Sequence, residues 1–287
     1  MEYHQMFVSF VCHRFRHKSF QVFFIPLFTI NYAVEAFFKR MRTLTTIMLL
    51  CVGLLSASAQ ERKVENKPYI DFRPFHLGIV VGTHLQDMEL VNRGPQLITD
   101  ETGATSEKLI SVEQDRWDAG FNVGVVGELR INTNLQLRLT PQLYFGTRHL
   151  TFLNHTDVDA AGRNIVQHQE MKTAYISTAF DVILAPLRFN NHRPYLIAGI
   201  NPMLNLSGKE TDYIRLKRFD AFAEVGVGCD FYLPYFKLRP ELKFMFGLTN
   251  ALDPNHASKL PDKNMFMYAN AASDVHSKMI VLSFYFE

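Results

Sequence analysis

A period of two in hydrophobicity runs through residues 75–286 and constrains the fold more than any other feature of the sequence. Side chains of a β-strand point alternately to the two faces of a sheet, so such a segment has one apolar and one polar face. The clearest example is 135–143, where Leu135, Leu137, Leu139 and Leu143 share one face and polar side chains share the other. The third strand extends from there towards 150. The other predicted strands are 75–85, 119–131, 172–184, 194–206, 220–233, 237–248 and 274–286.

The polar faces of these segments carry charges that the core of a soluble sheet protein would have to bury. Burying unpaired charge in an apolar core is costly. The pattern therefore favours a sheet that is turned inside out, with the apolar face towards lipid and the charged face towards a lumen. This predicts an all-β fold, an eight-stranded antiparallel up-and-down transmembrane β-barrel. The charges that we expect inside the lumen are Glu128, Arg130, Arg138, Arg148, Asp181, Glu224, Asp230, Arg239, Glu241 and Lys243.

The connections between the predicted strands alternate in length. Short ones are expected at 131–134, 186–193 and 234–236, and long polar ones at 86–117, 151–168, 207–217 and 249–273. Outer-membrane barrels have short turns in the periplasm and long loops outside, so both termini are expected to be periplasmic. The lumen of an eight-stranded barrel is narrow and filled by side chains. We therefore interpret the inward charges as a structural plug of paired groups rather than as an ion pathway.

The N-terminal part of the chain has the order of a secretory signal. Met41-Arg42 opens a short basic segment, an apolar run follows at 47–55, and a small-x-small cleavage site follows at 57–59. We therefore predict that 41–59 is a signal peptide and that 1–40 is an upstream extension from a mis-assigned start. Residues 60–74 would then be a periplasmic N-terminal segment, and 75–287 the outer-membrane barrel domain.

Charge and cysteine content argue against several other classes of protein. The chain has 30 basic and 28 acidic side chains, but six of the basic and two of the acidic ones lie in 1–59. The remainder has a net charge of −2, which gives no indication of nucleic-acid binding. Cys229 is the one cysteine beyond residue 59, so neither an intramolecular disulfide nor a zinc cluster is expected. The sequence predicts no metal and no cofactor.

A lipid hydrolase at the rim of the barrel is the enzymatic alternative. His149 and His155 fall near the outer end of the third predicted strand, and Ser177 falls on the fourth. Nucleophilic catalysis needs serine and histidine within hydrogen-bond reach and a third group that orients the base. Nothing in their spacing brings the three together. A protein without enzymatic activity is therefore the expectation.

Three segments in the second half of the chain resemble a known family. They read NHRPYLIAGINP at 191–202, EVGVGCDFY at 224–232 and FKLRPELKF at 236–244. In this order they are similar to the PorT family of outer-membrane barrels. The resemblance implies a non-enzymatic accessory role in the type IX secretion system, which exports surface proteases and gliding adhesins. It also implies a location in the bacterial outer membrane, with outer-membrane lipid and other secretion-system proteins as partners. A structural or adhesive barrel without a secretion role is the alternative.

Overall fold

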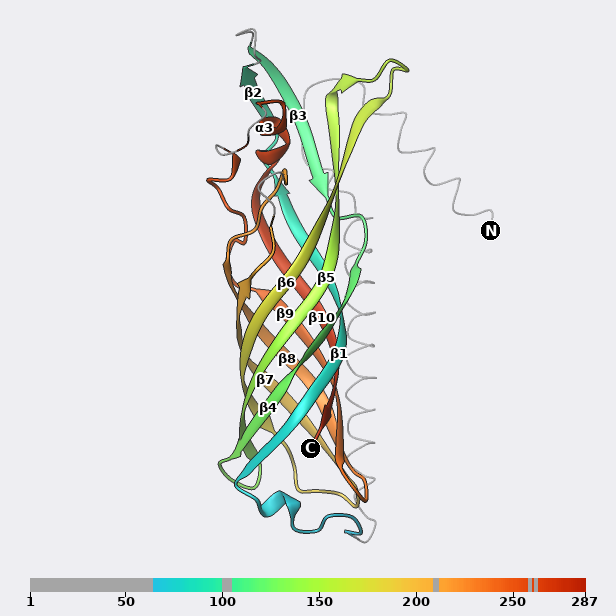
Figure 1. Ribbon diagram of the computed structural model, residues 1–287, viewed down its shortest axis with the longest axis vertical. Coiled ribbons are helices and arrows are strands. Elements are labelled where there is room, and N and C mark those ends of the chain that lie inside the picture. Colours follow the sequence, from blue (N-terminus) through green and yellow to red (C-terminus); the bar gives the residue numbers. More distant parts are fainter. Residues whose placement is uncertain (1–63, 100–104, 209–211, 258–259, 261–262) are drawn as a thin grey trace, which may run out of the picture. The chain divides into compact units, whose positions relative to one another are not determined.

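The computed structural model describes residues 64–99, 105–208, 212–257, 260 and 263–287 (Figure 1). The predicted extension at 1–40 and the predicted signal peptide at 41–59 lie outside these residues. Within the described part of the chain, ten strands form one continuous antiparallel sheet. No helix in this part has the length and apolarity that a membrane span needs.

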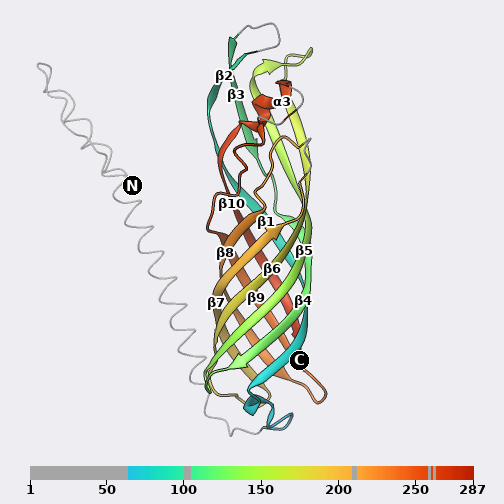
Figure 2. The ribbon, with the colours of Figure 1, turned by 60° about the vertical axis from the view of Figure 1, so that its left-hand side comes forward.

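Eight of the strands close into a ring, as the sequence predicts (Figure 2). Neighbours along the chain pair with each other, and the last strand pairs with the first, with Ile79 opposite Phe286. The ring strands are β1 (Phe75–Asn92), β4 (Asp118–Arg130), β5 (Leu135–Val158), β6 (Asn164–Leu184), β7 (His192–Asn205), β8 (Phe219–Tyr232), β9 (Lys237–Gly247) and β10 (Ala272–Phe286). Short connections at 131–134, 185–191 and 233–236 meet at one end of the ring, which we call the turn end. The opposite end is called the extended end.

The ring has an apolar outer face and a polar inner face. Leu77, Phe121 and Phe180 on the outside are each more than half exposed, whereas Glu128, Arg239 and Lys243 on the inside are fully buried. The alternation predicted for all eight strands is present in their burial patterns. A continuous exposed apolar band of this kind requires an apolar surrounding such as lipid, because exposing so much apolar surface to water is unfavourable.

The predicted polar connections at 86–117 and 151–168 are wrong in large part, because strands continue through them. β1 runs on to Asn92, β5 runs on to Val158, and β6 begins at Asn164. Two further strands, β2 (Pro95–Thr99) and β3 (Thr105–Glu113), form a hairpin whose second strand pairs with β5. The strands β3, β5 and β6 therefore carry the sheet beyond the ring at the extended end (Figures 1 and 2).

In these extensions the apolar side chains lie on the opposite face of the strand, which is why the sequence pattern does not predict them as parts of the same strands. Along β5, Leu139 and Leu143 are apolar and point outwards, but further along Leu150 and Phe152 are apolar and point inwards. The period of two persists, while the apolar residues change from odd to even positions. This is the expected result where a strand leaves lipid and enters water, because the apolar face must then turn inwards.

The interior of the extended end is an apolar core. Buried side chains from the extended strands pack there against Ile214 and Leu216 of the β7–β8 connection and Leu252 and Tyr268 of the β9–β10 connection. The short helix α3 (Lys263–Ala269), which the sequence analysis did not anticipate, supplies Tyr268. The ring of Tyr268 meets that of Phe152 edge-on at 5.8 Å between centroids. The long connections therefore fold inwards over the ring and close its extended end.

The apolar band can be tested with one substitution at two levels of the barrel. Val225 lies near the middle of β8 and is 50% exposed, so Val225→Lys puts a charge into lipid. We expect a loss of about 2–4 kcal/mol in the free energy of unfolding, measured by urea titration in phospholipid vesicles. Val166→Lys, at a 45% exposed valine on the extension of β6, is the matched control and should change stability little. Equal losses in both variants would contradict the assigned membrane level.

Candidate functional site

A continuous network of alternating charges fills the lumen at mid-height and towards the turn end. The guanidinium of Arg239 lies 2.6 Å from Glu128 Oε2 and 2.5 Å from Asp230 Oδ1. Glu128 also contacts Arg138 Nε at 3.2 Å, and Arg138 Nη1 lies 2.6 Å from Glu241 Oε2. Each of these side chains is at most 1% exposed. The network joins β4, β5, β8 and β9 from inside the ring.

The same network continues upwards through Lys243 and downwards through Glu287. Lys243 Nζ lies 2.9 Å from Glu224 Oε1 and 3.7 Å from Glu241 Oε1. At the turn end, Glu287 accepts from Arg239 at 2.6 Å and contacts Lys237 Nζ at 2.5 Å. Pairing of this kind is the condition under which charges are tolerated away from water. The lumen of the ring is therefore filled, not open.

Nine of the ten charges predicted for the lumen are buried inside the ring, but two of these, Arg148 and Asp181, are not paired with an opposite charge. Glu128, Arg138, Arg148, Asp181, Glu224, Asp230, Arg239, Glu241 and Lys243 are all buried inside the ring. Arg148 donates to Gln86 Oε1 and to Ser277 Oγ, both at 3.0 Å, and so is held by neutral groups. The oxygens of Asp181 have no hydrogen-bond donor among the described residues. Its cross-strand neighbour Arg138 is engaged by Glu128 and Glu241 instead.

Arg130 lies at the turn end and is not part of the lumen network, contrary to the prediction. It is the last residue of β4, where the strand leaves the ring. Its guanidinium donates to the main-chain oxygens of Asp71 and Asn132 and lies 5.6 Å from the centre of the Phe72 ring. A position at the end of a strand lets a long side chain turn away from the lumen to nearby carbonyl groups.

Two members of the network, Lys237 and Glu287, are missing from the predicted set of lumen charges. Lys237 has the same parity as Arg239, Glu241 and Lys243, so the alternation of β9 already places it inside. Glu287 follows the parity of the inward Ser283 and Tyr285 on β10. The signal was therefore present in the period of two. It was missed for Glu287 because the residue lies just beyond the last strand.

Two tyrosine hydroxyl groups donate further hydrogen bonds to the Glu241 carboxylate of the network. The hydroxyl of Tyr195 donates to Glu241 Oε2 at 2.8 Å, and that of Tyr285 donates to Glu241 Oε1 at 3.2 Å. The Tyr195 ring occupies the space above Gly228, its direct partner on β8. A side chain at 228 would overlap this ring. The glycine is therefore needed for the close approach of the ring.

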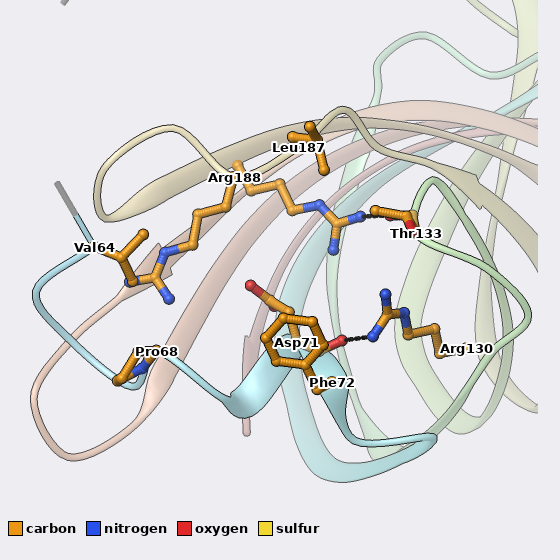
Figure 3. A pocket seen from close by; sticks show the side chains of 9 residues that line it. Val64, Pro68, Asp71, Phe72, Arg130, Thr133, Leu187 and Arg188 are labelled. Carbon is orange, nitrogen blue, oxygen red and sulfur yellow. Dashed lines mark hydrogen bonds between the residues drawn. The ribbon is translucent and has the colours of Figure 1, made fainter. Parts of the chain in front are cut away.

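The described part of the N-terminal segment, 64–74, lies against the turn end. It forms one wall of a pocket of about 230 Å³ that Pro68, Phe72 and Leu187 line together with Arg130 and Arg188 (Figure 3). Arg188 donates to the main-chain oxygens of Asn66 at 2.5 Å and Lys67 at 3.2 Å.

The Arg188 guanidinium also stacks 3.6 Å from the centre of the Tyr232 ring, and the Tyr232 hydroxyl donates to Asp71 Oδ1 at 2.6 Å. On the opposite side of the pocket, Arg193 donates to Pro186 O and Thr133 O. Guanidinium donors here bind main-chain carbonyls, so the pocket anchors this segment to the ring.

Ser177, His149 and His155, the three residues of the possible hydrolase site, lie in different surroundings. Ser177 is buried inside the ring at 1% exposure. His149 lies outside it and pairs with Asp118 Oδ1 at 2.8 Å, whereas His155 contacts Ser111 Oγ at 2.9 Å. The geometry therefore does not assemble the catalytic set that was considered. Among the described residues, no cluster of three or more His, Cys, Asp or Glu side chains could hold a metal ion.

Polar groups of the extended end are arranged as in a water-soluble protein. Lys108 of β3 pairs with Asp157 of β5, and this hydrogen bond holds the pKa of the Asp157 carboxyl below its usual value. Burial among the apolar side chains raises the pKa of Tyr268. These groups hold the hairpin and the closing loops in place.

The comparison with protein families decides the class of this barrel. Residues 58–253 match the family described as "Outer membrane protein beta-barrel domain". This chain belongs to that family. The barrel is accordingly a bacterial outer-membrane protein, in agreement with its apolar outer band. No curated protein matches the chain.

Solved structures of outer-membrane proteins are similar to this barrel at a distance. OprG of Pseudomonas aeruginosa is 10% identical with a TM-score of 0.39, covering 73% of this chain and 92% of that chain. The Ail attachment invasion locus protein of Yersinia pestis, solved with the heparin analogue sucrose octasulfate, is 12% identical with a TM-score of 0.34, covering 75% and 99%. Neisserial surface protein A is 11% identical with a TM-score of 0.36, covering 74% and 98%. Likenesses this distant do not indicate a shared function.

Removal of one arginine from the network should destabilise the barrel strongly. Arg239→Met leaves Asp230, and part of Glu128 and Glu287, without their buried partner. We expect a loss of about 3–5 kcal/mol in the free energy of unfolding in vesicles. Arg163→Met removes the exposed pair with Asp159 and should cost about 0–1 kcal/mol. Similar values for the two variants would show that the network does not stabilise the ring.

The tight packing of Tyr195 over Gly228 gives a second test of the lumen. Gly228→Val should displace the tyrosine ring from Glu241 and cost about 1–3 kcal/mol through overpacking. The neighbouring Cys229 is on the opposite face of β8, so Cys229→Val is the matched control and should be close to neutral. Thermal unfolding, followed by the gel mobility of the folded and unfolded forms, measures both. A neutral Gly228→Val variant would contradict the close approach.

Proposed function

We propose that this barrel is a non-enzymatic accessory component of the type IX secretion system, in the manner of the PorT family. The proposal is supported by the resemblance of the segments at 191–202, 224–232 and 236–244. These segments lie on β7, β8 and β9, which are neighbours in the ring. In this proposal the turn end and both termini face the periplasm, and the extended end faces outwards.

The filled lumen is the observation that carries the mechanism. Exported proteins are far larger than the lumen of an eight-stranded barrel, and here that lumen is occupied by the charge network from Lys243 to Glu287. Above the network, the apolar core around Phe152 and Tyr268 fills the extended end. A barrel that passes no cargo assists secretion by contacting other proteins of the system.

The extended end provides the surface for such contacts. β5 and β6 run well beyond the apolar band, and the β2–β3 hairpin is attached to β5. Leu97 at the middle of β2 is 77% exposed and gives the hairpin an apolar side chain for such a contact. The tail at 64–74 is a weaker candidate, because Arg188 and Arg130 bind its main chain to the ring.

The extension of β5 and β6 with the attached hairpin also favours an alternative, a structural or adhesive barrel. Strands that lift a hairpin away from the membrane also suit a protein that contacts external surfaces. The two functions differ in the consequence of losing the gene, because an adhesive barrel is not needed for the export of other proteins.

A clean deletion of the gene tests the proposal. We expect type IX cargo to accumulate in the periplasm, as measured by fractionation and immunoblotting of surface and periplasmic fractions. A copy that begins at Met41 should restore delivery, which also tests the predicted start of translation. Normal delivery of cargo in the deletion strain would reject the secretion role and favour the structural or adhesive alternative.

A loop exchange in the complemented strain tests the contact surface. Replacement of the β2–β3 hairpin should impair delivery, provided that gel mobility shows a folded barrel. The matched control replaces residues 159–163 at the β5–β6 tip, where Asp159 Oδ1 accepts from the main-chain nitrogens of Ala161 and Arg163 in a self-contained turn. Intact delivery with the exchanged hairpin would exclude the hairpin as the contact, while leaving the deletion result as it stands.

A further inference from the structure

A hollow with two arginines lies on the outside of the barrel at the extended end of β7. It has a volume of about 360 Å³ and is lined by Leu204, Leu206, Ser207, Arg215 and Arg218, among others. One side of the hollow is therefore apolar and the other is cationic. It is separate from the lumen network and from the pocket at the turn end.

The hollow lies at the edge of the apolar band. Leu206, which lines it, is 59% exposed, and Phe219, the partner of Leu204 on β8, is 58% exposed. The main-chain nitrogen of Leu206 donates to Ala174 O of β6 at 2.8 Å, so the two residues are at the same level. The next outward residue along β6 is Lys172, which is exposed. The outward residue after it is Glu170, which is also exposed, so the outer surface changes here from apolar to charged. We place the lipid headgroups at this level.

The two arginines are held by their main chains, while their guanidiniums are free. The main-chain oxygen of Arg218 accepts from Asn205, and that of Arg215 accepts from Asp253 at 3.0 Å. In the described part of the chain, neither guanidinium has a hydrogen bond or ion pair. Two other cations of the extended end do have partners: Lys108 pairs with Asp157, and Lys278 pairs with Glu89. Free guanidiniums beside an apolar wall suit a ligand with both an anionic and an apolar part.

We propose that this hollow binds the phosphate-bearing headgroup of a membrane lipid in the leaflet at the extended end. The guanidiniums of Arg215 and Arg218 bind phosphate oxygens, for which the planar fork of arginine is well suited. The acyl chains lie along Leu204, Leu206 and Phe219. The inference depends on the outer-membrane location of the barrel and is independent of any role in secretion.

Lipid binding to the purified full-length barrel tests the proposal. Native mass spectrometry in detergent, with dioleoyl phosphatidic acid as the probe, should show one lipid retained at higher affinity than the rest. We expect R215Q/R218Q to weaken this binding at least about tenfold, since each charge-assisted hydrogen bond lost is worth about that factor. R93Q/R163Q removes the same charge from exposed positions in the turns after β1 and β5 and should bind as the unaltered protein does. An equal loss in both variants would overturn the proposal.

Further measurements separate the two parts of the ligand. Leu206→Gln should weaken the binding of phosphatidic acid without changing that of inorganic phosphate. Dioleoylglycerol, which lacks the phosphate, should bind at least about tenfold more weakly than phosphatidic acid. Displacement of the lipid by millimolar inorganic phosphate would identify a site for the free anion and overturn the lipid assignment. Capture of an acidic peptide in preference to phosphatidic acid would overturn it in favour of a protein partner.

Discussion

The charge network inside the ring is the interaction on which the rest of the barrel depends. Each strand of the ring must put its apolar side chains into lipid, so its other face must be polar and has to be satisfied inside. Arg239 and Arg138 do this by sharing Glu128, and Lys243 extends the pairing to Glu224 and Glu241. Because these residues come from strands that are far apart in the sequence, the network also joins one side of the ring to the other. The side chains of the network are buried and occupy the lumen at this level.

The apolar side chains of the sheet change from its outer face to its inner face where the barrel leaves the membrane. Inside the apolar band, β5 points leucines outwards and Arg138 inwards, whereas in the extension the same strand points Leu150 and Phe152 inwards. The connections at 212–218 and 248–257 follow this change, since Ile214 and Leu252 complete the apolar core. One continuous sheet is therefore surrounded by lipid along one part of its length and by water along the other. The free arginines Arg215 and Arg218 lie at the boundary between them, where an anionic headgroup meets an apolar chain.

A partner protein can contact only those surfaces of the barrel that the chain itself does not cover. The lumen is filled by charges and aromatic rings, and the segment at 64–74 is bound to the turn end by Arg188 and Arg130. Exposed surfaces of the described residues include the apolar wall, the boundary with Arg215 and Arg218, the β5–β6 extension and the β2–β3 hairpin with its exposed Leu97. An accessory role in secretion through the hairpin, together with a bound lipid at the boundary, would use two of these surfaces.

The alternation of residues by itself determined the ring. All eight strands, the direction in which their faces point and nine of the charges buried in the lumen follow from the period of two, since a strand in lipid has a single permitted polarity. It also places Lys237 inside, whereas Glu287, which lies just beyond the last strand, was not predicted there. The tertiary structure decided which charges pair: Arg138 binds Glu128, its register neighbour on β4, and Glu241 of β9, but not Asp181, its register neighbour on β6. It also decided that Arg130 turns away to the tail, and that the segments read as loops are strands with the opposite face apolar. These outcomes depend on which side chains meet across the ring and on where lipid ends, and neither is encoded in the spacing of residues along one strand.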